Sequence, residues 1–187
     1  MRLSLRTALG ALPAFTLALL AANPAAAELK TGTPAPSFAT QASLGGKTFT
    51  FDLARALAVG PVVLYFYPEA FTTGCTIEAH DFAEHMGDYK KLGATVIGVS
   101  GDDIEKLRKF SVSECRNKFP VAADLDLKIA TAYDAKIGLG PIAYANRTSY
   151  VIARDGKIAY AYTSMDPQEH VANTLAALRK LPQKRQP

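Results

Sequence analysis

Two continuous apolar runs indicate the centre of a β-sheet. Residues 62–67 are all apolar or aromatic and follow Pro61 directly, and residues 94–100 form a second run rich in β-branched side chains. Runs of this kind are typical of strands that are buried on both faces. Between them, apolar residues recur at intervals of three and four, which predicts an amphipathic helix whose inner face carries Ala79, Phe82, Met86 and Tyr89.

The alternation of helix and strand continues after the second run. Asp102 and Asp103 are suitable caps for a helix with Ile104, Leu107 and Ser111 along one face. Weaker patterns predict a short strand at residues 120–123, a short helix at residues 126–133, a loop at residues 138–141 and a closing helix at residues 168–180.

Glycine-containing turns predict a hairpin near each end of the domain. An extended opening segment at residues 31–38 is followed by the turn Gly45-Gly46 and a strand at residues 47–53. The second hairpin turns at Asp155-Gly156, a strong signal for a two-residue turn. Its strands are residues 148–153 and 158–163.

These elements together predict an α/β fold. Parallel strand-helix-strand units followed by an antiparallel hairpin and a terminal helix match a mixed central sheet flanked by helices. Thioredoxin-like folds have this arrangement, and here an N-terminal hairpin extends it. We expect a single domain at residues 28–187.

The N-terminus has the pattern of a cleaved signal peptide. Arg2 and Arg6 precede an apolar run at residues 9–22, and the small residues 25–27 form an A-x-A cleavage site. A membrane anchor is the alternative, but the run contains Pro13 and is shorter than the ~20 residues of a spanning helix. We expect cleavage after Ala27, a periplasmic location and no membrane attachment afterwards.

Removal of this segment changes the charge balance. The net charge of the chain is +4, and loss of Arg2 and Arg6 lowers it to +2. The remaining basic residues are spread along the chain, apart from a small group near the C-terminus. Nucleic-acid binding therefore has no support.

The chain has two cysteines, Cys75 and Cys115, and both lie in the exported part, where disulfides form and persist. Their separation matches neither a CxxC motif nor a zinc-ribbon spacing. His80, His85 and His170 form no convincing ligand set, so we expect no metal and no cofactor.

Cys75 occupies a reactive position in the predicted fold. It lies in the first turn of the helix that follows the central strand. Unpaired backbone N–H groups and the positive end of the helix dipole stabilise a thiolate there. The thiolate is the nucleophilic form of cysteine.

The residues around Cys75 resemble the peroxiredoxin signature. Pro68, Thr72 and Cys75 have the spacing of its proline, its threonine or serine and its peroxidatic cysteine. The surrounding string is similar to the Q-type, or bacterioferritin-comigratory, branch of the family. The similarity extends from about Leu29 to residues 147–152 and so covers essentially the whole mature chain.

This resemblance implies a role for each motif residue. Cys75 attacks the terminal peroxide oxygen and becomes a sulfenic acid. The Thr72 hydroxyl holds the peroxide and the sulfur, and Pro68 shields the thiolate from water. Arg147 stabilises the thiolate and polarises the peroxide, while Glu78 falls where relatives carry an acid that supports this arginine.

Each of these residues also has a structural alternative. Cys75 could be an inert thiol and Thr72 a loop residue. Pro68 could simply end a strand, and Arg147 could be a solvated charge. Many Q-type members carry a resolving cysteine five positions after the peroxidatic one, where this chain has His80. Cys115 lies where another subset of the branch has its resolving cysteine, but it also shares a helical face with Ile104 and is a candidate core residue.

The sequence therefore predicts a cofactor-free thiol peroxidase. The expected substrates are hydrogen peroxide and organic hydroperoxides, and the expected reductant is a thioredoxin-like protein or a small thiol. We expect a monomer or a homodimer. The alternatives are a thioredoxin-like thiol-disulfide oxidoreductase, which would want a CxxC, and a copper-binding or partner-holding module, which would want a CxxxC and a placed histidine.

Overall fold

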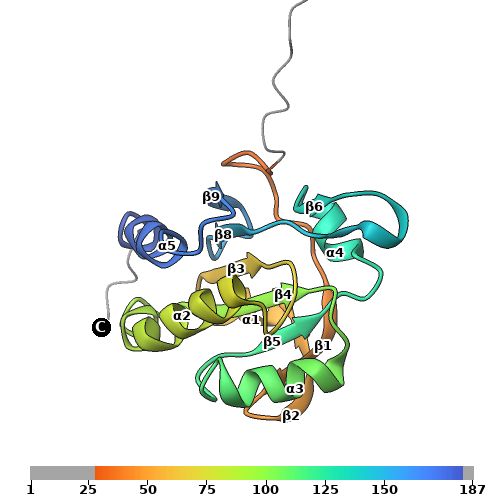
Figure 1. The fold of residues 1–187 in the computed structure, drawn as a ribbon. Helices are drawn as coiled ribbons and strands as arrows, with labels where there is room; N and C mark the ends of the chain where they lie inside the picture. The colour runs from red at the N-terminus through yellow and green to blue at the C-terminus, as the bar shows by residue number, and fades with distance from the viewer. Residues whose placement is uncertain (1–27, 183–187) are drawn as a thin grey trace, which may run out of the picture.

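The computed structural model describes residues 28–182, so the predicted signal peptide lies outside the described residues. Within residues 28–182, seven strands form one mixed sheet in the order β2-β1-β5-β4-β3-β8-β9 (Figure 1). Their bounds are β1 (Ala39–Leu44), β2 (Lys47–Asp52), β3 (Val62–Phe66), β4 (Thr95–Ser100), β5 (Val121–Ala123), β8 (Thr148–Ile152) and β9 (Ile158–Thr163).

The centre of the sheet is parallel and its two sides are antiparallel. β3 pairs in parallel with β4, and β4 with β5, whereas β8 runs antiparallel to β3. Every residue of β3 is buried, as expected for a continuous apolar run covered on both faces. The hairpins β1-β2 and β8-β9 complete the two sides, which confirms both predicted hairpins.

Helices cover both faces of the sheet. One apolar cluster unites α2, α3 and α5 with the alternate residues Val63 and Tyr65 of β3. A second cluster on the opposite face joins α1 and α4 to Val62 and Leu64. The helices are α1 (Leu53–Val59), α2 (Thr73–Lys91), α3 (Ile104–Ser113), α4 (Lys128–Ala132) and α5 (His170–Arg179). This arrangement confirms the predicted mixed α/β fold.

The sequence pattern missed α1. The predicted strand at residues 47–53 ends at Asp52, whose side chain accepts a hydrogen bond from the backbone N–H of Arg55 and so caps α1. Leu53 is the first residue of this helix and is buried. An apolar residue that follows a strand directly prolongs its alternating pattern, which hides the change of structure.

Short elements lie in and beside the loop expected at residues 138–141. β6 (Lys136–Ile137) and β7 (Tyr144–Ala145) form a small two-stranded sheet, with the 3-10 turn η1 (Gly140–Ile142) between them. The predicted helix at residues 126–133 is shorter than expected, because α4 comprises only Lys128–Ala132. Pairs of two-residue strands give no periodic signal in a sequence.

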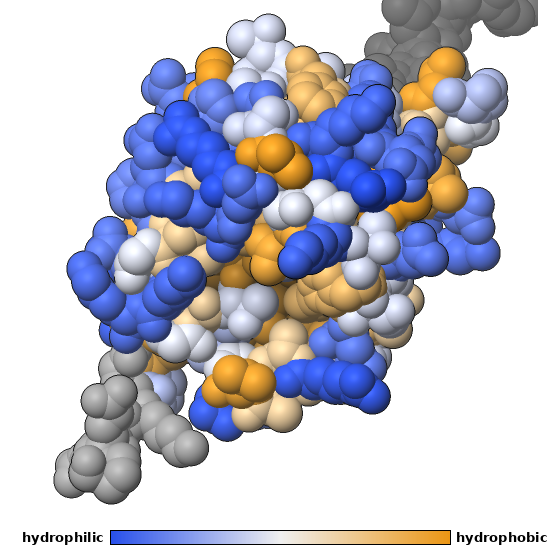
Figure 2. All heavy atoms as spheres, turned by 90° about the horizontal axis from the view of Figure 1, so that it is seen from below, coloured by the Kyte–Doolittle hydropathy of each residue, from blue (hydrophilic) through white to orange (hydrophobic). Residues whose placement is uncertain are grey.

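The surface seen in Figure 2 is mainly hydrophilic, with apolar side chains in small groups between charged ones. Exposed apolar residues among the described ones include Phe71, Ile77 and Met165. No helix within residues 28–182 is long and apolar enough to cross a membrane.

A side chain at Gly98 in β4 would clash with the core of the sheet. A Cβ atom there would lie 2.6 Å from Cζ of Tyr65, its neighbour in β3. Gly98→Ala should lower the free energy of unfolding by about 1–3 kcal/mol, because the buried ring must move. The control is Gly87→Ala in α2, where a Cβ meets no atom within 4 Å. This change should raise stability by about 0.5–1 kcal/mol. Urea denaturation measures both changes in the free energy of unfolding, and equal effects would contradict the predicted clash with Tyr65.

Candidate active site

Cys75 is the third residue of α2 and lies at the carboxyl end of the central strand β3. Its side chain is buried, with an exposed fraction of 2%. The first residues of a helix have backbone N–H groups without partners inside the helix. The predicted position of Cys75 at a helix start is therefore confirmed, and its sulfur lies in a region of positive potential.

Arg147 reaches Cys75 because β8 pairs with β3. The register places Thr148 opposite Phe66, so Arg147 lies beside the point where the chain leaves β3 toward the cysteine. The Arg147 side chain is 3% exposed, and its Nη2 donates to Cys75 Sγ across 3.4 Å. The structure thus brings together two residues that are 72 positions apart.

Glu78 holds the guanidinium from the other side. It is one helical turn after Cys75, so both side chains project from the same face of α2. Its Oε2 accepts a hydrogen bond from Nη1 of Arg147, while Nε of Arg147 donates to the Met165 carbonyl at 3.1 Å. Gly74 leaves room for this arrangement, because a Cβ there would lie 3.0 Å from Nη2.

The carboxyl group of Glu78 is completely buried. Burial acts to raise its pKa above the ordinary value, and the positive charge of Arg147 acts in the opposite direction. Its second oxygen, Oε1, accepts no hydrogen bond from the described residues. The nearest basic nitrogen recorded for that oxygen is Nδ1 of His170, at 3.7 Å.

His170 is a site neighbour that sequence reasoning missed. It is the first residue of α5 and is fully buried. Its Nε2 donates to the carbonyl of Ser164 at 3.0 Å, so Nδ1 accepts from the hydroxyl of Ser149 at 2.8 Å. Burial lowers its pKa to about 4 and keeps the ring neutral. A single histidine in a helix has no sequence pattern that places it near a distant cysteine.

Thr72 and Pro68 lie in the loop that leads to Cys75. Thr72 is exposed and is the N-cap residue of α2, and its hydroxyl donates to the Glu69 carbonyl at 2.9 Å. Pro68 is half-buried. Neither side chain has a recorded hydrogen bond to the sulfur, so their expected roles toward peroxide stay predictions.

Asp102 anchors this loop, a role that differs from the predicted one. The cap of α3 is Asp103, which accepts from the Lys106 backbone N–H at 2.8 Å. Asp102 instead accepts from the Ala70 backbone N–H at 2.7 Å and forms an ion pair with Lys106. The same lysine pairs with Glu69 at 2.7 Å. β4 and α3 therefore hold the cysteine loop on the side opposite Arg147.

Cys115 lies beyond the helix on which it was expected. α3 ends at Ser113, and Glu114 is its C-cap. The side chain of Cys115 is fully buried in the same apolar cluster as Cys75, and both residues are free thiols. Burial and the nearby Glu114 carboxylate raise the pKa of the Cys115 thiol well above its ordinary value.

The three histidines lie in separate places. His80 contacts Glu114, His85 contacts Asp81, and His170 contacts Ser149. Among the described residues, no group of three or more potential ligands could hold a metal ion.

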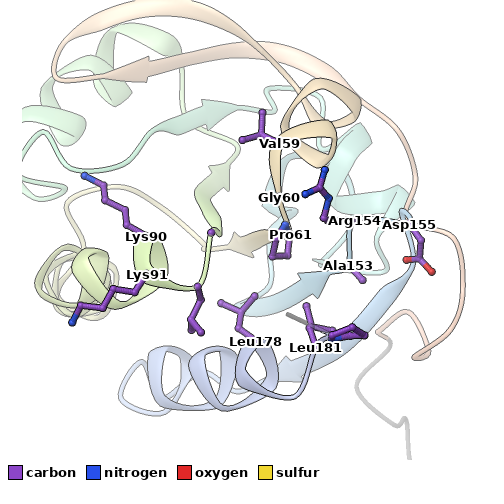
Figure 3. A pocket seen from close by; sticks show the side chains of 13 residues that line it. Val59, Gly60, Pro61, Lys90, Lys91, Ala153, Arg154, Asp155, Leu178 and Leu181 are labelled. Carbon is purple, nitrogen blue, oxygen red and sulfur yellow. The ribbon is translucent and has the colours of Figure 1, made fainter. Parts of the chain in front are cut away.

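A cavity of about 520 Å³ lies away from these residues, between the C-terminal ends of α2 and α5 (Figure 3). Pro61 lines it, at the opposite end of β3 from Cys75. The described residues that line this cavity include neither Cys75 nor Arg147.

Comparison with known proteins places the chain in a family. The AhpC/TSA family matches residues 31–161. The chain belongs to this family, the peroxiredoxins. It is therefore a thiol-dependent peroxidase, and the peroxiredoxin identification made from the sequence is confirmed.

Individual relatives agree with the Q-type branch. The chloroplastic peroxiredoxin Q of Triticum aestivum is 34% identical over 152 residues, which cover 80% of this chain and 67% of the relative. The Helicobacter pylori peroxiredoxin bcp is 32% identical over 159 residues, 81% of this chain and 99% of the relative. The crystal structure of peroxidoxin BcpB from Mycobacterium tuberculosis has a TM-score of 0.76 and 31% identity, covering 82% of this chain and 99% of that chain.

The buried His170 should make the stability of this peroxiredoxin depend on pH. In the folded protein its pKa is about 4, whereas the ordinary value is 6.5. As the pH falls from about 6.5 to 4, the unfolded chain takes up a proton that the folded protein does not. The contribution of His170 to stability is therefore lost over this window, by roughly 3 kcal/mol at most, while the raised pKa of Glu78 acts in the opposite direction as the pH falls.

Replacement of the ring tests this dependence. The free energy of unfolding of His170→Gln, measured by urea denaturation at pH 7 and pH 5, should increase relative to that of the wild type on acidification. Glu78 titrates in both proteins, so the prediction concerns the difference between the two profiles. Asn173→Gln on the same helix controls for altered packing. If the free energies of unfolding of wild type and His170→Gln changed in parallel with pH, the assignment of a neutral, buried ring would be contradicted.

Proposed function

We propose that Cys75 is the peroxidatic residue of this peroxiredoxin and that Arg147 and Glu78 prepare it for reaction. The observation that carries this proposal is the contact of Arg147 Nη2 with Cys75 Sγ at 3.4 Å, with Glu78 pairing on the same guanidinium. A fixed positive charge beside a sulfur at a helix start favours the thiolate. The thiolate is the form that attacks peroxide.

The chemistry follows from this placement. The Cys75 sulfur donates an electron pair to the terminal oxygen of the hydroperoxide, and the O–O bond breaks. The leaving oxygen takes up a proton and departs as water or an alcohol, while Cys75 keeps the other oxygen as a sulfenic acid. Negative charge develops on the leaving oxygen, and a guanidinium next to the sulfur stabilises that charge.

Cys115 is the proposed resolving residue. Its thiol sulfur attacks the Cys75 sulfenic acid, the S–O bond breaks, and the hydroxyl leaves with the thiol proton as water. The resulting disulfide is reduced by a dithiol of a thioredoxin-like protein, which becomes oxidised in turn. Both cysteines belong to one apolar cluster, which supports this pairing. A disulfide needs Cα atoms within ~7 Å, so local unwinding at a helix end accompanies the reaction where the separation is larger.

Peroxide consumption by the purified, reduced protein tests the assignments. Cys75→Ser should consume peroxide at least about 1,000-fold more slowly than the wild type, because serine is not ionised at neutral pH. Arg147→Lys should be slower by about 10- to 100-fold, because the compact ammonium group lacks the three separated nitrogens with which the planar guanidinium reaches Cys75, Glu78 and the Met165 carbonyl. After one equivalent of peroxide, digestion without reductant should give a linked peptide containing Cys75 and Cys115.

Cys115→Ser should form the sulfenic acid at the wild-type rate but turn over slowly with a dithiol donor. Substantial activity in Cys75→Ser would reject the peroxidatic assignment. Full turnover of Cys115→Ser, together with no linked peptide in the wild type, would indicate a cycle in which a donor thiol reduces the sulfenic acid directly.

The periplasm is the proposed location. The basic, apolar and small-residue sections of residues 1–27 support export and cleavage after Ala27. Mass spectrometry of the protein recovered from the periplasmic fraction of its native host should give an N-terminus at Glu28. Recovery of the intact N-terminus in the membrane fraction would instead indicate an anchor.

A further inference from the structure

The two residues that flank Cys115 both contact α2 through their side chains. Arg116 forms an ion pair, and Glu114 accepts a hydrogen bond from His80 that is an ion pair when His80 is protonated. Glu114 Oε2 lies 2.8 Å from Nε2 of His80, and Arg116 Nη1 lies 3.1 Å from Oε1 of Glu84. The segment that follows α3 is therefore held to α2 by side-chain contacts immediately before and immediately after Cys115.

The anchors on α2 lie close to the peroxidatic end of that helix. His80 and Glu84 are four residues apart, so they lie on one face of α2. His80 is five residues after Cys75, little more than one helical turn. The two ion pairs thus join the Cys115 segment to the part of α2 that begins with the reactive thiol.

The backbone around Cys115 is in a conformation that side-chain-bearing residues rarely adopt. Arg116 has a φ of 50° and Asn117 a φ of 57°, both in the left-handed region. Asparagine tolerates this region, but arginine does so less readily. Backbone hydrogen bonds from Cys115 N–H to the Phe110 carbonyl, at 3.1 Å, and from Lys118 N–H to the Cys115 carbonyl, at 2.9 Å, help to maintain the turn.

We propose that Glu114 and Arg116 are positioning residues that hold Cys115 in its buried place, and that both ion pairs open before Cys115 reaches the oxidised Cys75. The second part rests on the proposed resolving role of Cys115. Once the turn opens, the Cys115 sulfur attacks the Cys75 sulfenic acid, and the hydroxyl leaves with the thiol proton as water. The ion pairs therefore act on the resolving step and not on the attack on peroxide.

The strength of these contacts suits a reversible restraint. The side chains of Arg116 and Glu84 are 43% and 60% exposed, and Glu114 is more buried at 18%. Exposed pairs typically shift an equilibrium by about two- to fivefold each. Loss of one pair should therefore raise the population of the open turn by that factor, without unfolding the domain.

Alkylation of Cys115 measures opening independently of peroxidase activity. In a Cys75→Ser background Cys115 is the single thiol of the chain, and iodoacetamide reaches it only when the turn opens. Glu114→Gln and Arg116→Gln should each increase the labelling rate about two- to fivefold, and the double variant should exceed either. Glu105→Gln is the matched control, because it removes a pair with Arg108 at the other end of α3.

Reversal of the charges separates an ion pair from a general structural effect. The double change Glu84→Arg with Arg116→Glu should restore slow labelling, whereas either change alone should accelerate it. Equal labelling rates in the parent and in the Gln variants would overturn the positioning role. So would an equal acceleration in Glu105→Gln, or a failure of the reversed pair to restore the rate.

The effect on catalysis is measured with Cys75 intact. The proteins are mixed rapidly with one equivalent of hydrogen peroxide, and both rates are followed. Glu114→Gln and Arg116→Gln should consume peroxide at the wild-type rate but form the disulfide about two- to fivefold faster than wild type. Faster labelling with an unchanged rate of disulfide formation would refute the claim that opening precedes resolution. If wild-type protein forms the sulfenic acid but no disulfide, the resolving role of Cys115 fails, while labelling still decides whether the ion pairs position it.

Discussion

The site depends on a buried guanidinium. Arg147 is almost fully removed from solvent, and an unpaired charge at such a depth costs several kcal/mol. Its partner Glu78 is on α2, whereas Arg147 precedes β8, so this ion pair fixes the helix that carries Cys75 against the sheet. The β3-β8 register, the missing side chain at Gly74 and the Met165 carbonyl all allow the guanidinium to lie there.

The cysteine loop is restrained from a second direction as well. Asp102 accepts from the Ala70 backbone N–H, and Lys106 links Asp102 to Glu69. These contacts come from the end of β4 and the start of α3, while Arg147 comes from the start of β8. A loop held between neighbours on both sides keeps Cys75 near the guanidinium, which is the kind of preorganisation that electrostatic catalysis requires.

Periodic patterns in the sequence predicted most of the strands and helices that surround the site, because burial in strands and helices repeats along the chain. The pattern at β3, the helix start at Cys75 and the Asp155-Gly156 turn are local features. The failures concern properties that no local pattern encodes. Asp102 and Asp103 are chemically identical neighbours, yet only the fold decides that one caps α3 and the other binds the loop. The contact of His170 with Ser149 depends on tertiary packing between distant segments.

The two thiols differ in environment, and this difference gives them separate proposed roles. Cys75 lies at the positive end of a helix beside a guanidinium, which suits its proposed role as the residue that attacks peroxide. Cys115 lies in an apolar cluster with a carboxylate on the adjacent residue, and both features keep it protonated. A protonated thiol is a poor nucleophile. In the proposed cycle Cys115 therefore reacts with the sulfenic acid of Cys75 only after its surroundings change, so oxidation of Cys75 precedes movement of the Cys115 turn.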